Sequence, residues 1–395
     1  MHDLIIAGGG PAGLSAAIMA AQRGLDAVVV DPHPGVIDKA CGEGLMPGAV
    51  VELCTARQRY RLLVPERIGV IGETPLAGWR LPVGSHLLRL RAPGRIEVCY
   101  PVCIERGGHW HGLRPGGDSP APIYLPRPDE VDSDEVYVPA GWFLSGEPTG
   151  PLRRVWLDGF CIQRNPVTNA EWIRWLNTLL DEGREEEARR CLPRDRGSRP
   201  HTDGEPLIGM RDGRFVLKED PDGDSWEPDV PVVMLRFSEL LAYAADQHDR
   251  TGLPWRLPFE LEWEKAARGV DGRACPWGNT PDPAWANTLH STSGRPLPAT
   301  VDRFETDASS YGVRGMGGNI SDWCLDIFGE EPPPITEDGL AILNIPPSDA
   351  SGYRSNRGGC WVWSHIYSRA GLRFSHPPDG RTAEIGVRLV RPLVG

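Results

Sequence analysis

The chain has 395 residues and a formal net charge of −12 at pH 7, and it is long enough for two or three domains. The acidic balance argues against nucleic acid or an anionic membrane as the main partner, and no apolar run approaches the ~18–20 residues of a membrane span. With 47 glycines and 39 prolines, the composition indicates a loop-rich protein and not a helical bundle.

The cysteines and the N-terminus predict where the protein resides. Nine cysteines are an odd number, and no two of them form a CxxC pair, so we expect reduced thiols and no disulfide framework. Asp3 interrupts the apolar N-terminus, and neither a basic segment nor a small-residue cleavage site follows, so we expect no signal peptide. These features predict a cytoplasmic protein.

Residues 1–55 have the pattern of the first βαβ unit of a Rossmann-like nucleotide-binding fold. In order, the pattern consists of a strand at 4–7, a glycine-rich turn at 8–13, a helix from 14 and a strand at 27–30. The turn glycines Gly8, Gly10 and Gly13 allow the backbone to approach a pyrophosphate. Asp31, at the end of the second strand, can bind a ribose hydroxyl. The fragment therefore has the chemistry of an ADP-binding site.

The segment that follows, residues 38–47, resembles the corresponding loop of FAD-dependent monooxygenases and geranylgeranyl reductases. In that family the chain continues for hundreds of residues, and a later Gly-Asp motif closes over the flavin. Here the sequence changes character after about residue 55. One βαβ unit cannot form a parallel sheet that is covered on both faces, so bound FAD is not expected. Whether the fragment is a functional fusion or a remnant is left open.

Residues 58–112 alternate apolar and polar side chains and predict a small antiparallel β-sandwich. The expected strands lie at 61–64, 67–72, 86–91 and 95–100. The turns at 72–76 and 81–86 resemble a PEGA-type β-module, which occurs together with a lectin-like domain in bacterial fusion proteins. Residues 113–136 are rich in Pro, Gly and Asp and predict a linker.

Three helices are predicted in the C-terminal part. Thr168 and Glu171 form a capping box that opens a helix over 172–181. Ser238 is expected to cap a second helix over 239–248, and Gly269 to end a third over 258–268. Short strands and long loops are expected elsewhere, which makes the domain α+β.

Seven motifs follow one another in a fixed order in the same region. They are 138–143, 166–172, 256–269, Pro276-Trp277-Gly278, 312–323, Arg357-Gly358-Gly359-Cys360-Trp361 and 385–389. This series resembles the formylglycine-generating enzyme and sulfatase-modifying factor family over residues 137–395. The resemblance implies an elaborated C-type-lectin-like fold. The tryptophans Trp263, Trp277 and Trp323 are expected in its core.

The resemblance also implies where copper would bind. In the catalytic family members, two cysteines after the Arg-Gly-Gly-Ser motif hold copper(I) as thiolates. In this chain Trp363 occupies the first of those positions, and no cysteine follows Cys360, which itself stands at the serine position of the motif. One thiol cannot supply a site of two thiolates. Copper and catalytic residues are therefore not expected.

Aromatic and basic side chains cluster in this same segment. They are Trp361, Trp363, His365, Tyr367, Arg369 and Arg373. Residues of these types carry binding hot spots, so we predict a groove for an unknown protein or small-molecule ligand. In the alternative interpretation, half of these side chains belong to the core and the rest are ordinary surface.

Calcium is the metal that the resemblance favours. Family members hold structural calcium with the Asn of an Ala-Asn pair and with the Asn and the acid of a Gly-Asn-x-x-Glu-Trp motif. Here the corresponding residues are Asn287, Asn319 and Asp322, which offer hard oxygen ligands. The sequence as a whole predicts a binding or regulatory module. The alternative is an oxidoreductase of the formylglycine-generating or flavin-dependent type.

Overall fold

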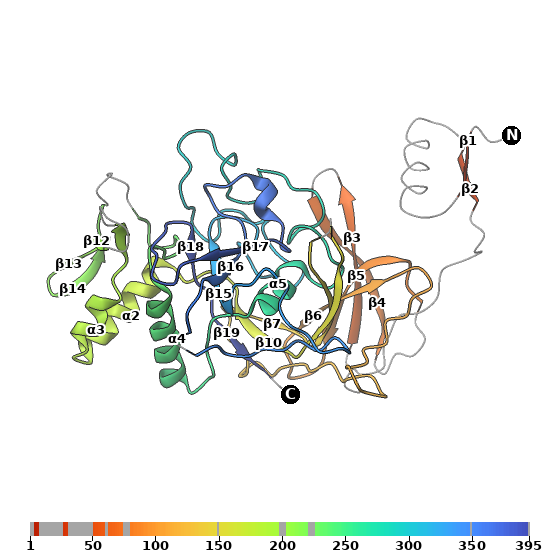
Figure 1. Ribbon diagram of the computed structural model, residues 1–395. Coiled ribbons are helices and arrows are strands. Elements are labelled where there is room, and N and C mark those ends of the chain that lie inside the picture. The colour runs from red at the N-terminus through yellow and green to blue at the C-terminus, as the bar shows by residue number, and fades with distance from the viewer. Residues whose placement is uncertain are drawn as a thin grey trace.

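The computed structural model describes residues 4–7, 27–30, 50–59, 62–73, 80–147, 150–196, 203–219, 226–347 and 350–393. At the N-terminus, β1 (Leu4–Ala7) and β2 (Ala27–Val30) are both present and pair in parallel (Figure 1). This is the strand arrangement that a βαβ unit requires. The expected nucleotide contacts Gly8, Gly10, Gly13 and Asp31 lie outside the described residues.

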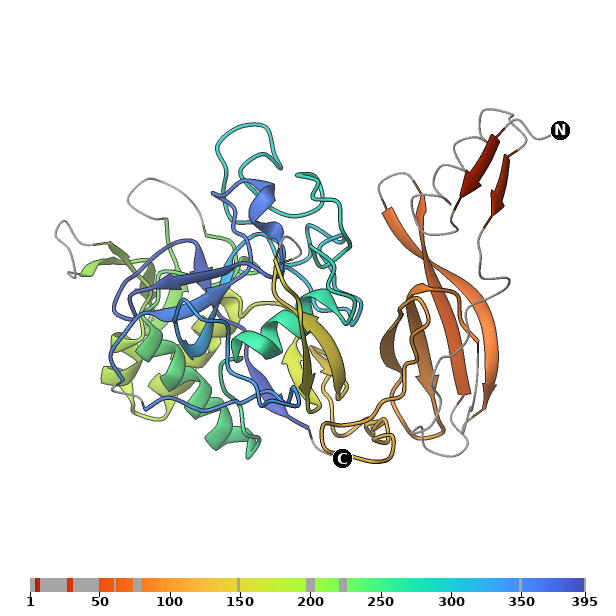
Figure 2. The same cartoon turned by 45° about the vertical axis from the view of Figure 1, so that its right-hand side comes forward.

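The middle of the chain forms one four-stranded antiparallel sheet in the order β4-β3-β5-β6. Its strands are β3 (Val50–Arg59), β4 (Leu62–Glu73), β5 (Gly84–Arg91) and β6 (Val98–Ile104). The expected sandwich is therefore wrong for these strands, which make a single layer (Figure 2). Strand β3 was not predicted, and it runs across the expected domain boundary at residues 55–58.

The second layer against this sheet comes from the C-terminal part of the chain. Leu88 and Leu90 of β5 pack in one cluster with Tyr137 and Cys161. Leu125 is completely buried in the same cluster, so the segment 113–136, expected as a linker, contributes to the core at this point, although most of its residues are exposed or half-buried. The sheet needs this covering because one face of β5 is apolar and cannot remain in water.

The C-terminal domain is built on two sheets and a β-hairpin. The first sheet has the order β19-β10-β7, and the second has the order β17-β16-β15-β18. The strands of the first are β7 (Glu135–Val138), β10 (Phe160–Gln163) and β19 (Val390–Pro392), and the hairpin is β8 (Gly141–Ser145) with β9 (Arg153–Leu157). The strands of the second are β15 (Ser321–Ile327), β16 (Arg354–Arg357), β17 (Arg373–His376) and β18 (Ile385–Gly386). Strand β7 begins two residues before the expected domain start at residue 137.

Two small hairpins and a short helix complete the strands and loops. The hairpins are β11 (Arg194–Arg196) with β12 (Asp203–Pro206), and β13 (Ile208–Arg211) with β14 (Arg214–Leu217). The 3₁₀ helix η1 (His365–Ser368) precedes β17. Together with the helices described next, these elements confirm an α+β domain.

Helix α2 (Asn169–Asp181) begins as predicted, with Thr168 and Glu171 forming a capping box. Helix α4 (Phe237–Thr251) begins earlier than predicted. Its N-cap is Arg236, whose backbone N–H donates to the Glu239 carboxylate at 2.9 Å. Ser238 therefore lies within the first turn and is not the cap.

Helix α5 (Glu260–Arg268) ends at Gly269 as predicted, where φ is +73°. The short helix α3 (Glu185–Arg190) was not predicted. Helices α2, α3 and α4 lie on the side of the domain away from the middle sheet (Figure 1). In the described part of the chain, no helix combines the length and the apolar character that crossing a membrane requires.

The core of the C-terminal domain is rich in aromatic side chains. Trp172 packs against Trp175 and Tyr243, with ring centroids 4.8 and 5.0 Å from its own. Trp263, Trp277 and Trp323 are buried, as predicted. Every side chain of α5 is buried, including its charged ones. That helix therefore needs ionic partners, and these hold the candidate site in place.

Candidate functional site

Glu260, the first residue of α5, anchors the segment expected to form the groove. Its carboxylate accepts hydrogen bonds from Arg373 Nε at 2.7 Å and from Arg373 NH2 at 2.8 Å. Arg357 NH1 lies 3.3 Å from the same carboxylate, and Ser355 donates to it at 2.7 Å. Burial alone would raise the pKa of Glu260, but the hydrogen bonds of Arg373 and the charge of Arg357 outweigh it and lower the pKa. Arg373 is therefore engaged in holding β17 in place.

Two other predicted groove residues also have structural partners. Arg369 NH1 lies 3.0 Å from Glu147 Oε2, and Arg369 Nε donates to Ile366 O at 3.1 Å. Trp361 Nε1 donates to Ala383 O at 2.9 Å. The polar groups of Trp361 and Arg369 are therefore used within the fold. These two residues follow the alternative interpretation of the sequence, in which the side chains of this segment belong to the core or to ordinary surface.

The remaining predicted residues gather with Phe374 at the surface. The ring of Trp363 lies 4.6 Å from that of Phe374 and 5.6 Å from that of Tyr367, measured between centroids. Tyr367 is 39% exposed and Ile366 is 49% exposed. We call Trp363, Ile366, Tyr367 and Phe374 the aromatic cluster. His365 is half-buried in the adjoining η1, and its Nδ1 has no hydrogen-bond partner.

Sequence reasoning did not include Phe374 or Ile366. Strand alternation misled here: with Arg373 expected in the groove, alternation places Phe374 on the opposite face, but Arg373 turns inward to Glu260 and Phe374 faces the cluster. Ile366 lies within the 3₁₀ turn, where strand alternation gives no guidance.

Cys360 does not offer a thiolate to this surface. It is completely buried, and burial raises the pKa of its thiol to about 12. A thiol with such a pKa stays protonated at neutral pH and is a poor metal ligand. In the described ranges, no three His, Cys, Asp or Glu side chains come together as a metal site. Cys360 is therefore not placed as a metal ligand at this surface.

The sequence predicted two calcium sites, one at Asn287 and one at Asn319 and Asp322, and the side chains named for them are engaged within the fold. Asn287 and Asn319 are neighbours, since Asn287 Nδ2 donates to Asn319 Oδ1 at 3.0 Å. That oxygen also accepts from Ala299 N at 2.8 Å. Gly318 makes this approach possible, because a Cβ there would lie 2.6 Å from Asn287 O. The two asparagines therefore satisfy each other and the loop.

Asp322 faces a different partner. Its Oδ2 accepts from Arg388 Nε at 2.7 Å and from Trp263 Nε1 at 2.7 Å, and all three side chains are buried. A calcium ion beside this carboxylate would lie next to a buried guanidinium of the same charge sign. The second predicted site therefore does not fit calcium, because its only carboxylate is already paired with Arg388.

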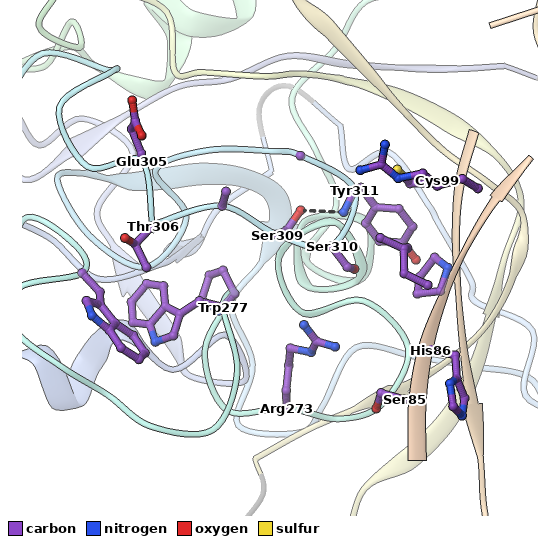
Figure 3. A pocket seen from close by; sticks show the side chains of 17 residues that line it. Ser85, His86, Cys99, Arg273, Trp277, Glu305, Thr306, Ser309, Ser310 and Tyr311 are labelled. Carbon is purple, nitrogen blue, oxygen red and sulfur yellow. Dashed lines mark hydrogen bonds between the residues drawn. The ribbon is translucent and has the colours of Figure 1, made fainter. Parts of the chain in front are cut away.

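A second hollow lies between the middle sheet and the C-terminal domain. It is a cavity of about 480 Å³, lined on one side by β5 and β6 and on the other by loop residues 273–285 and 305–312. Figure 3 shows its labelled side chains, with Arg273 placed between Trp277 and Ser85 in this view. We call this space the intermodule cavity. Sequence reasoning missed it because its walls come from segments almost two hundred residues apart.

One hydrogen-bonded chain spans the edge of this cavity. Ser85 Oγ donates to Asp271 Oδ2 at 2.5 Å. Arg273 binds the same carboxylate from its other side through Nε at 2.8 Å and NH2 at 2.7 Å. Burial alone would raise the pKa of Asp271, but the hydrogen bonds and the charge of Arg273 lower it. Asp271 is thus ionised and ties the sheet to the domain.

Family models match two parts of the sequence. Residues 123–393 match the sulfatase-modifying factor enzyme 1-like domain, and residues 3–49 match an FAD binding domain. The first match covers more than half of the chain and includes the aromatic cluster and one wall of the intermodule cavity.

Several known proteins are similar over the same region. Hercynine oxygenase of Mycolicibacterium smegmatis is 31% identical over 295 residues, covering 69% of this chain and 64% of that protein. The formylglycine-generating enzyme of Thermomonospora curvata is 26% identical over 305 residues, covering 67% of this chain and 96% of the enzyme. The serine/threonine-protein kinase pkn1 of Chlamydia caviae is 27% identical over 272 residues, covering 67% of this chain and 39% of the kinase. The chain thus spans less than two thirds of the first and the last of these proteins.

Among solved structures, PvdO from Pseudomonas aeruginosa superposes with a TM-score of 0.49 and 24% identity. The superposition covers 70% of this chain and all of PvdO.

Proposed function

The chain belongs to the sulfatase-modifying factor enzyme 1-like family, and from that premise we propose that its C-terminal domain is a binding module. It binds a protein or small-molecule ligand on the aromatic cluster and does not oxidise a substrate with copper. The single observation that carries this proposal is the Trp363–Tyr367–Phe374 cluster, in which Tyr367 is exposed and the other two rings are half-buried. By the family resemblance, Trp363 stands at the position of the first copper cysteine of catalytic relatives.

The exposure of the aromatic cluster supports binding. Ile366 and Tyr367 leave apolar surface in contact with water, although the chain has ample core to bury such side chains. Tyr and Trp supply a large contact area and lose little conformational entropy when they bind. An exposed cluster of this kind favours recognition over chemistry, because Tyr367 is its only ionisable member and no acid or base of the described residues is hydrogen-bonded to that phenol.

The support beneath the cluster is rigid. Phe374 follows Arg373, which the buried Glu260 holds in a bidentate pair. Trp363 is fixed through its backbone, whose carbonyl accepts from Leu289 N at 2.9 Å. A preorganised surface loses less entropy on binding than a mobile one, so this arrangement is suited to affinity.

The alternative function is that of an oxidoreductase. It is favoured by the match of residues 3–49 to an FAD binding domain and by the parallel pairing of β1 and β2. It is also favoured by the similarity to proteins named hercynine oxygenase and formylglycine-generating enzyme. Retention of a yellow chromophore through gel filtration would move this alternative ahead of the binding module.

Selection from a phage-displayed peptide library, using the full chain as bait, tests the proposal directly. Peptides selected on the wild type should bind the Tyr367→Ala variant roughly tenfold or more weakly, the usual loss at a hot spot. Tyr353→Ala is the matched control, because Tyr353 is also an exposed tyrosine, at 55%, and lies outside the aromatic cluster.

Two results would reject the proposal. One is a set of peptides whose affinities are the same for the wild type and for both variants. The other is a set of peptides that Tyr353→Ala weakens as much as Tyr367→Ala does. Thermal melts of each variant establish that Tyr367→Ala still folds.

A further inference from the structure

The intermodule cavity has an apolar wall formed by the middle sheet. Leu87 and Arg89 of β5 lie opposite Pro101 and Cys99 of β6 in the antiparallel register, and all four line the cavity. Side chains alternate along β5, and Leu88 and Leu90 point to the opposite face, where they enter the core. The sheet thus uses one face for folding and presents the other to the cavity.

The facing wall is aromatic. Trp277 and Trp285 meet edge to face, with their centroids 6.0 Å apart, and Tyr311 lines the same space. Both tryptophans line the cavity, and Trp277 is buried whereas Trp285 is half-buried. Aromatic rings in this arrangement favour a planar ring as their partner.

Polar groups around the cavity include donors that lack acceptors. Arg89 Nε and Ser310 Oγ have no hydrogen-bond partner. Ser309 Oγ accepts from Tyr311 N at 3.3 Å and from Val313 N at 3.2 Å, so its own O–H remains to be donated. A guanidinium nitrogen can only donate. Arg89 Nε and Ser310 Oγ are closed off from solvent, so the lining residues hold hydrogen-bonding capacity that no protein acceptor of the described chain uses.

The charges near the sheet wall also favour a ligand that carries an acceptor. Arg89 NH1 lies 3.2 Å from Glu97, and Arg91 binds the same carboxylate. One carboxylate thus serves two guanidinium groups. Arg273 is already held by Asp271, and Glu305 is an exposed residue of the opposite wall. A second carboxylate beside Arg89 would be matched in charge and in hydrogen bonding.

We propose that the intermodule cavity binds a small planar aromatic molecule that carries a carboxylate. Its ring packs against Trp285 and Tyr311, and its carboxylate accepts from Arg89 and from the serines of residues 309–310. A cavity of about 480 Å³ is within the size range of small-molecule sites. This site is separate from the aromatic cluster, so the two proposals fail independently.

Isothermal titration calorimetry of the full chain with three probes tests the proposal. Naphthoate combines the ring and the carboxylate, naphthylmethanol keeps only the ring, and cyclohexanecarboxylate keeps only the acid. We expect naphthoate to bind, and each of the others to bind roughly tenfold or more weakly, the loss expected for one charge-assisted hydrogen bond or one stacking contact.

The matched variants are Arg89→Gln and Arg91→Gln. Each removes one of the two arginines that share Glu97, and each leaves the other in place, so neither leaves that carboxylate unpaired. Arg89→Gln should weaken naphthoate roughly tenfold and leave naphthylmethanol unchanged. Arg91→Gln should change neither, because Arg91 does not line the cavity. Trp285→Leu should weaken both ring-bearing probes.

Two outcomes overturn the proposal. The first is the absence of heat with naphthoate, which would mean that water satisfies the donors. The second is naphthoate binding that neither Arg89→Gln nor Trp285→Leu weakens, which would place the probe elsewhere. Thermal melts of each variant exclude unfolding as the cause of a loss.

Discussion

Arg388 donates through Nε to Asp322 Oδ2 over 2.7 Å, and both side chains are completely buried. The carboxylate also accepts from Trp263, and Arg388 NH2 donates to Gly315 O at 3.1 Å. This pair therefore connects β15, α5 and the glycine-rich loop before β15. In this position each desolvated charge has the other as its ionic partner.

Removal of Asp322 should therefore be strongly destabilising. Asp322→Ala leaves Arg388 as an uncompensated buried charge, and such a change lowers the free energy of unfolding by about 3–5 kcal/mol. Urea unfolding followed by circular dichroism measures the change. The control is Asp181→Ala, which breaks an exposed pair with Arg214 and should cost about 1 kcal/mol or less. Equal losses for the two variants would contradict the structural role of the Asp322–Arg388 pair.

Calcium should not stabilise the protein, because the only carboxylate of the expected ligand set is bound to Arg388. An ion that bound only the folded chain at a hundredfold excess over its Kd would add about 2.7 kcal/mol. Such a contribution is visible as a shift in Tm, and we expect melts in EGTA and in millimolar calcium to coincide. A calcium-dependent rise in Tm that Asn319→Ala abolishes would instead establish a site at Asn287 and Asn319.

Asp307 should make stability fall as the pH rises. Burial raises the pKa of this carboxyl from 3.8 to about 7, so the folded state holds its proton more tightly than the unfolded state. Between about pH 4 and pH 7 the folded state binds more protons, and its stability therefore decreases with pH by at most roughly 1.4 kcal/mol per unit.

Asp307→Asn removes this dependence. The free energy of unfolding of the variant, relative to the wild type, should therefore rise from about pH 4 to pH 7 and level off above it. The amide oxygen can still accept from Gly317 N, which donates to the wild-type carboxylate at 2.9 Å. Urea titrations across this pH range give the difference. A difference that is independent of pH would show that Asp307 is ionised throughout.

The domain should be silent toward cysteine-containing sulfatase peptides. Copper(I) held for oxygen chemistry needs two soft ligands, and the segment after the Arg-Gly-Gly motif offers only the buried Cys360. Incubation with copper(I), oxygen and a Cys-x-Pro-x-Arg peptide should give no aldehyde by mass spectrometry. The Cys360→Ser variant, which restores the serine of the motif, should behave identically. Aldehyde from the wild type that this variant loses would reject the binding module.

Local signals in the sequence predicted local structure well. The capping box of Thr168 and Glu171 lies within four residues, and the structure forms it as predicted. Ser238 misled the prediction of the second helix. The cap depends on the extended backbone of Arg236 and on the Glu239 carboxylate, and no residue-type rule selects an arginine there.

Long-range partners could not be predicted in the same way. The motif around Asp322 suggested a metal ligand, but the partner that determines its role, Arg388, comes 66 residues later. The intermodule cavity is a stronger example, because Arg89 and Trp285 meet the same space without any local pattern joining them. The aromatic cluster falls between these cases, since Trp363 and Tyr367 were predicted and Phe374 was not.

The pairing of β19 with β10 has a consequence for synthesis of the protein. Val390 lies opposite Ile162, and Arg391 makes a bidentate pair with Glu135 at 2.6 and 2.7 Å. The ribosome must therefore complete more than two hundred intervening residues before β10 gains its neighbour. Until then, one edge of the first sheet is open to pairing with another nascent chain. Chaperone dependence during translation should thus be greatest before residue 390 emerges.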